Sequence, residues 1–157
     1  MATTFTSQPF ELAVGEDVVR ADIEFQGIDH SETSYEGRVF LNNPDATEGT
    51  PTTEDEGYAG SFHIFGHGGC YGDDHGHCEV VPRRPFDPRP EHPLARAGKT
   101  VIATEALRRV AAPGSTVRIT VVPVITGLTE RCTTTDVFDA QSIEVRLYAG
   151  DAGAEAG

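Results

Sequence analysis

The sequence predicts an all-β fold, an antiparallel β-sandwich of about six to eight strands with one short helix. Stretches in which apolar and polar residues alternate recur along the 157-residue chain, and this period of two is typical of half-buried strands. The 17 glycines and 10 prolines indicate many turns and leave little room for long helices. Tryptophan is absent and methionine occurs once, so Val, Ile, Leu and Phe must build the core. Two sheets packed face to face are the architecture that such strands favour.

The first clear strand is VVRADIEFQGI, residues 18–28. Ala21, Ile23 and Phe25 alternate there with polar residues, so these three side chains are expected on one face of the strand. A polar turn, GIDHSETS, follows and separates this strand from the next.

A second strand is expected in YEGRVFLNNPD, with Val39 and Leu41 on one face and Phe40 on the other. Its Asn-Asn-Pro sequence ends the strand. The following residues, 45–57, are acidic and rich in Thr, Gly and Pro, and we interpret them as a solvated loop.

The third strand is predicted in AGSFHIF, residues 59–65. Phe62 and Ile64 would share one face, and His63 and Phe65 the other. A glycine-rich segment with several Cys and His residues follows directly, so the candidate ligands begin on a strand and continue into a loop.

A short strand and a brief helix are expected next. KTVIAT, residues 99–104, has the pattern of a strand, and Thr104 could cap a helix over residues 105–110. Leu107 and Val110 would lie on the buried side of that helix, and Pro-Gly stops it.

Two further strands complete the prediction. TVRITVVPVI, residues 116–125, has the strongest pattern, and Pro123 indicates an edge position or a bulge near its end. SIEVRLYAG, residues 142–150, closes the sheet. Three of its side chains are expected to face inward: Ile143, Val145 and Leu147.

The length fits a single domain over residues 1–157. Its core would span about 18–149, with an N-terminal extension over 1–17 and a flexible tail over 150–157. The formal charge of −13 repels phosphate backbones and anionic lipid, which argues against nucleic acid and membrane partners. The start, MATTFTSQPFELAVGEDVV, lacks a basic n-region and a hydrophobic stretch, so we expect no signal peptide and a cytoplasmic location.

The stretch GHGGCYGDDHGHC, residues 66–78, is the most informative part of the sequence. With His63 just upstream, it gathers four of the six histidines and two of the three cysteines within sixteen residues. Thiolate and imidazole suit copper and zinc, and the glycines let the backbone fold tightly around one ion. The candidate metal ligands are His63, His67, Cys70, His75, His77 and Cys78.

Other interpretations of this cluster stay open. Cys70 and Cys78 could form a disulfide, which would be the default in an exported protein. The histidines could be ordinary solvated loop residues. The spacing matches no standard zinc motif, so the sequence does not specify the geometry. Cys132 could add a third thiolate or be an inert buried thiol.

The order of the motifs resembles the C-terminal β-sandwich domain of the tyrosinase, polyphenol oxidase and haemocyanin group. The segments that carry the resemblance are YEGRVFLNNPD, YAGSFHIFGH, KTVIATEALRRV, STVRITVVPVI and SIEVRLYAG, over about residues 18–149. The resemblance implies a domain that is not the catalyst but leans on a helical domain in which six histidines hold two coppers. No part of this sequence matches that helical domain, and the GHGGCYGDDHGHC insertion departs from the group's plainer turn.

These observations favour an accessory, non-catalytic protein that binds a copper or zinc ion through the Cys/His-rich segment. It would stabilise, shield or metal-load a separately encoded dicopper oxidase. Motifs of metal-free catalysis such as G-x-S-x-G are missing, so we do not expect such an enzyme. Two alternatives stay open: a small copper- or zinc-dependent metalloenzyme with an open coordination position, and a metal-free interaction module with a Cys70–Cys78 disulfide. The sequence does not predict the oligomeric state.

Overall fold

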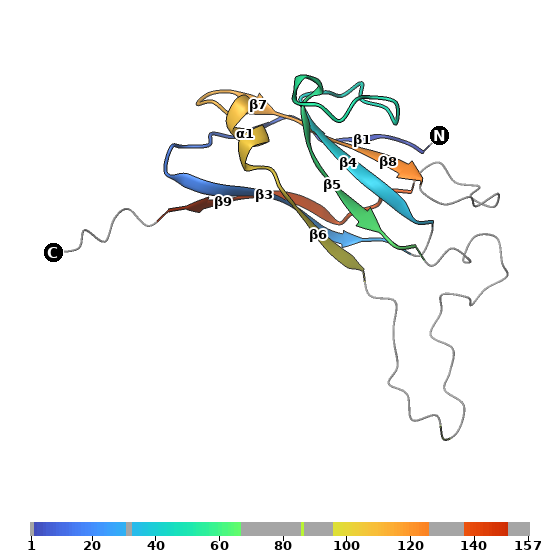
Figure 1. Cartoon of the computed structure of the whole chain (residues 1–157). Helices are drawn as coiled ribbons and strands as arrows, with labels where there is room; N and C mark the ends of the chain where they lie inside the picture. The colour runs from blue at the N-terminus through green and yellow to red at the C-terminus, as the bar shows by residue number, and fades with distance from the viewer. Residues whose placement is uncertain (1, 31–32, 67–85, 87–95, 126–136, 151–157) are drawn as a thin grey trace.

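Two sheets packed face to face form the body of the molecule (Figure 1). The computed structural model describes residues 2–30, 33–66, 86, 96–125 and 137–150. One sheet has the strand order β1-β8-β4-β5 and consists of β1 (Phe5–Thr6), β8 (Ile119–Ile125), β4 (Tyr35–Leu41) and β5 (Tyr58–Ile64). The other has the order β6-β3-β9 and consists of β6 (Ala97–Ile102), β3 (Val18–Ile28) and β9 (Ser142–Ala149). A small third sheet pairs β2 (Phe10–Glu11) with β7 (Thr116–Val117).

Every strand pair in the described residues is antiparallel, which confirms the predicted fold class. Six strands have six or more residues, and β1, β2 and β7 have two each. The one α-helix of the described residues, α1 (Thr104–Val110), lies where the sequence predicts it. No helix in this part of the chain is long and apolar enough to span a bilayer.

The alternation in β3 sets the inner face of the three-stranded sheet. Ala21, Ile23 and Phe25 are fully buried, as predicted, and the strand has the predicted bounds. On β4, Val39 and Leu41 face the main core, and Phe40 on the opposite face is also buried. A strand therefore presents apolar side chains on both faces where a second layer covers it.

That second layer is the segment between β4 and β5. Most of residues 45–57 are exposed, as expected of a solvated loop, and they include a 3-10 helix, η1 (Glu54–Glu56). Ala46 is the exception, because it is buried against Phe40 and Val122. The loop thus covers part of the outer face of the four-stranded sheet.

The helix begins differently from the prediction. Ala103, not Thr104, is the N-cap residue, and no side chain caps the helix. The Thr104 hydroxyl oxygen instead accepts a hydrogen bond from the Ala21 backbone N–H at 3.0 Å, so it is used to join α1 to β3. Leu107 is fully buried and Val110 partly buried, as predicted.

The predicted continuous strand over residues 116–125 is two strands. Asn42, whose φ is 55°, interrupts it: its side-chain Oδ1 accepts a hydrogen bond from the Arg118 backbone N–H, and its own N–H donates to the Arg118 carbonyl. These two hydrogen bonds, both 2.8 Å long, use the backbone N–H and the carbonyl of Arg118. The chain can therefore pair with β2 before this point and with β4 after it.

Pro123 lies in β8, beyond Thr120 and Val121, the two residues that pair with β1. At Pro123 the strand therefore has only one neighbour among the described strands, β4, and the β4–β8 pairing shows no bulge there. This confirms the predicted edge position of Pro123.

The sequence predicts that Leu147 faces inward, but Leu147 is 37% exposed, whereas Ile143 and Val145 pack against the core. Because β9 is an edge strand, the end that carries Leu147 is only half covered.

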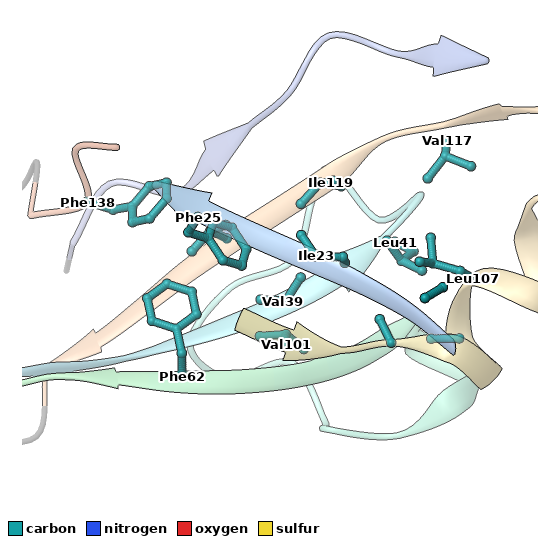
Figure 2. Close-up of a cluster of buried hydrophobic side chains, with 14 of the residues drawn as sticks. Ile23, Phe25, Val39, Leu41, Phe62, Val101, Leu107, Val117, Ile119 and Phe138 are labelled. Carbon is teal, nitrogen blue, oxygen red and sulfur yellow. The ribbon is translucent and has the colours of Figure 1, made fainter. Parts of the chain in front are cut away.

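A cluster of aromatic rings fills one end of the core between the sheets (Figure 2). The Phe25 and Phe62 ring centroids are 4.7 Å apart, and Phe138 lies 6.0 Å from Phe25 and 6.1 Å from Phe62. Phe25 comes from the three-stranded sheet and Phe62 from the four-stranded sheet, so their contact joins the two layers.

We expect Phe25→Ala to lower the free energy of unfolding by about 3–5 kcal/mol, because it removes a fully buried ring and leaves a cavity. Urea denaturation followed by circular dichroism measures this change. Phe65→Ala is the matched control, since Phe65 is 82% exposed and its loss should cost less than about 0.5 kcal/mol. Equal effects of the two substitutions would contradict the role given to Phe25.

Candidate functional site

The strand register brings the two cysteine-bearing connections to one end of the sandwich. Tyr35, at the start of β4, pairs with Ile64 on one side and with Ile125 on the other. Ile64 and Ile125 are the last residues of β5 and β8. The segment after β5 contains the Cys/His cluster and the segment after β8 contains Cys132. Both segments therefore leave the sandwich at the same place, which we call the rim.

The described residues that flank the Cys/His segment are fastened at this rim. On the N-terminal side, the Gly66 backbone N–H donates a hydrogen bond to Ser34 Oγ at 3.0 Å. On the C-terminal side, Arg96 Nη1 donates to the Gly27 carbonyl and to Asp139 Oδ2, both at 2.9 Å. The start of β4 and the ends of β3, β5 and β8 lie together near these anchors (Figure 1).

His63 is the one predicted metal ligand among the described residues. It is exposed on the outer face of β5, opposite Glu36 on β4. Phe62 and Ile64 are buried and Phe65 is exposed, which confirms the predicted faces of this strand. Exposure next to a carboxylate-bearing neighbour makes His63 accessible to an ion at the rim.

The sequence does not predict that Glu36 is the cross-strand neighbour of His63. Its carboxylate pairs with Arg38 Nε at 3.0 Å, so it already has a cationic partner on the same strand. Pairing register between distant strands decides that Glu36 stands beside His63, and no local pattern in the sequence carries that information.

The other predicted ligands lie outside the described residues: His67, Cys70, His75, His77 and Cys78. Cys132 does so as well. Within the described part of the chain, no three His, Cys, Asp or Glu side chains come together as a metal group. The predicted ligand set therefore remains a prediction, with its first member placed on β5.

A pocket of about 570 Å³ lies at the opposite end of the sandwich, where β5 begins and β6 ends. Thr104, Glu105 and Arg109 line it from α1, and Tyr58 lines it from β5. Arg109 Nη1 also lies 3.2 Å from Glu54 Oε1, an ion pair beside the pocket. Among the residues that the structure describes, the predicted ligand His63 does not border it.

The outer face of the three-stranded sheet contains a buried carboxylate. Asp22 is only 1% exposed and accepts hydrogen bonds from Arg20 Nε at 2.8 Å and Nη2 at 2.7 Å. The hydrogen bond with Asp22 raises the pKa of Arg20, since it favours the charged guanidinium, and burial opposes it. Arg20 therefore stays charged at physiological pH, and its guanidinium carbon lies 5.6 Å from the centre of the Tyr148 ring.

The described residues thus define an antiparallel β-sandwich with the Cys/His-bearing connection at one rim. Solved structures with a similar fold include latent aurone synthase, a polyphenol oxidase, from its natural source, with a TM-score of 0.51. The recombinantly expressed latent enzyme co-crystallised with hexatungstotellurate(VI) gives 0.51, and the same preparation soaked in H2O2 gives 0.52. In each case the identity is 15%, and the match covers 94% of this chain and 24% of the other.

This chain therefore spans about a quarter of the length of the solved chains that it matches. At 15% identity the likeness establishes the fold alone. No family model matches the sequence, and no curated protein matches it either.

We expect Arg96→Ala to lower the free energy of unfolding by about 1 kcal/mol, because it removes the hydrogen bonds to Gly27 and Asp139 at a half-exposed site. Thermal denaturation measures this change. Lys99→Ala, in the strand β6 that begins directly after Arg96, removes one positive charge without removing these two bonds and serves as the control. An Arg96 variant as stable as the Lys99 variant would show that this anchor does not stabilise the rim.

Proposed function

We propose that this chain is an accessory, non-catalytic β-sandwich domain of the tyrosinase type. It binds one copper or zinc ion through the Cys/His-rich segment and stabilises, shields or metal-loads a partner dicopper oxidase. The observation that carries the proposal is the likeness of the fold to a quarter of a polyphenol oxidase chain, over 94% of this chain. The order of the sequence motifs independently supports the same family.

The ion-binding part of the proposal depends on the donor set. Four imidazoles and two thiolates within residues 63–78 provide more than the four ligands that zinc or copper(I) commonly takes. His63 is exposed beside the segment that contains the other donors, and Gly66 is fixed to Ser34. A strand-borne ligand followed by glycine-rich chain suits a site that closes around an ion when it binds.

The proposed accessory role depends on two features of the chain: the sequence has no motif of the helical copper domain, and its fold resembles part of a polyphenol oxidase chain. The sequence contains no helix-borne His-x3-His pair, and its His63-x3-His67 spacing begins on a strand. A sandwich of this type would therefore act on copper held by another protein. Its rim is the surface from which an ion could pass to such a protein, because the candidate ligands belong to the segment that leaves there.

We expect the chain, purified without a histidine tag, to contain about one copper or zinc ion. Joint replacement of Cys70, His75, His77 and Cys78 by serine should abolish binding of this ion. It should also remove the stabilisation of about 2.7 kcal/mol that metal at 100 times its Kd provides, or roughly 5–10 °C in Tm. Native mass spectrometry and thermal denaturation are the two measurements.

His92→Ser is the matched control for that variant, since it removes an imidazole that lies outside the candidate ligand set. His63→Ala then tests the strand-borne ligand separately, and we expect weaker metal binding with an unchanged metal-free Tm, because the side chain is exposed. A metal-free protein whose denatured mass is about two hydrogens low would instead indicate a Cys70–Cys78 disulfide and overturn the metal site.

The partner part is tested with a dicopper phenol oxidase from which its own accessory domain has been removed. We expect addition of this chain to change at least one of three properties of that oxidase: its rate of phenol oxidation, its copper content or its Tm. The serine variant separates the roles, because shielding should survive it and metal loading should not. An oxidase unchanged in all three properties would contradict the accessory role.

A further inference from the structure

The outer edge of β9 is a long strand edge that no other described strand covers. β9 pairs with β3 along eight residues, from Ser142 to Ala149, and its other side has no paired strand among the described residues. The other long edge strands, β5 and β6, face each other across the sandwich: a methyl group added at Gly60 would lie 2.7 Å from the Val101 side chain. Of these three edges, β9 is thus the one that faces no other edge strand among the described elements.

This edge lacks the features that usually prevent a strand from pairing with another chain. It contains no proline, its register with β3 is regular from Ser142 to Tyr148, and no charged side chain points inward. Its inward side chains are Ile143, Val145 and Leu147, none of which is fully buried. Its outward charged residues, Glu144 and Arg146, are more than half exposed.

We propose that β9 pairs antiparallel with β9 of a second copy of this chain, with the twofold axis at Val145. The two three-stranded sheets would then form one continuous six-stranded sheet across a symmetric interface. This inference concerns the described residues alone and is independent of the proposed metal-binding role.

Charge complementarity selects this register. With Val145 opposite Val145 of the second copy, Glu144 faces Arg146 of the second copy, and this pair occurs twice because of the symmetry. Moving the axis to Glu144 would place two Glu144 carboxylates opposite each other. Moving it to Arg146 would place two Arg146 guanidinium groups opposite each other. Like charges directly opposite destabilise a strand pair, so both neighbouring registers are disfavoured.

The apolar side favours the same register. Cross-strand neighbours in an antiparallel pair lie on the same face, so Ile143 would contact Leu147 of the second copy and Val145 would contact its own counterpart. Leu147, 37% exposed in the single chain, would be covered in this way. The interface therefore explains an inward-facing leucine that the fold by itself leaves half exposed.

The ion pairs within one chain do not compete strongly with this arrangement. Arg146 Nε contacts Glu24 Oε2 at 3.0 Å, and Arg146 Nη2 lies 3.7 Å from Glu144 Oε2. The second contact is long for a charge-assisted hydrogen bond, so Glu144 can turn to a partner across the interface. The net charge of −13 opposes self-association, so the local pairs and the backbone bonds must outweigh it.

Charge reversal tests the interface and its register together. The full chain is studied by sedimentation equilibrium in physiological salt, and we expect a concentration-dependent dimer. Glu144→Arg and Arg146→Glu should each weaken the dimer by about tenfold or more, because each turns two attractive pairs into two repulsive ones. The double variant Glu144→Arg/Arg146→Glu restores both pairs and should restore the dimer.

Glu24→Gln is the matched control, since it removes the intramolecular partner of Arg146 on β3 and should leave the dimer intact. A second test uses a chain whose three native cysteines are replaced by serine. Val145→Cys should then form a disulfide between copies under mild oxidation, since directly opposite residues are close enough to bridge. Ile143→Cys alone should form much less, because it faces Leu147 of the second copy.

A chain that stays monomeric up to about 100 µM would overturn the proposal. A dimer that responds equally to the single and double charge variants, or in which Ile143→Cys bridges as readily as Val145→Cys, would place the interface elsewhere. Circular dichroism of each variant confirms that the chain remains folded, so a loss of the dimer reflects the interface.

Discussion

The contact between Phe25 and Phe62 is the constraint on which the rest of the structure depends. The two rings come from opposite sheets and fix which face of β3 and which face of β5 point inward. Because side chains alternate along a strand, burying Phe62 forces His63 outward, and burying Phe25 places Asp22 and Glu24 on the outer face. The exposed chemistry of both sheets therefore follows from the packing of their inner faces.

The outer faces of the two sheets differ in what covers them. The outer face of the four-stranded sheet is partly covered by the loop after β4, which buries Phe40, Ala46 and Val122 in a second small core. The outer face of the three-stranded sheet has ion pairs instead, among them Arg20 with the buried Asp22. Apolar residues suit the covered face, whereas paired charges keep the uncovered face compatible with water.

The rim is the boundary between the described sandwich and the segment that contains most of the candidate ligands. The path from β5 to β6 leads from one sheet to the other, so a long connection there must leave the sandwich at its end. Gly66 and Arg96 fasten this connection to the ends of the strands.

Local pattern in the sequence determined the six long strands, most of their inner faces and the position of the helix, because alternation and turn residues act over a few neighbouring positions. It did not predict the two-residue strands β1 and β2, which pair with distant residues. It also identified the donors in residues 63–78, since the type of a side chain is independent of its surroundings. Only the tertiary structure decided what depends on distant segments: the break at Arg118, the use of the Thr104 hydroxyl, the neighbour of His63 and the uncovered edge of β9. Each of these results from pairing between residues far apart in the chain, and a single sequence contains no signal for such pairing.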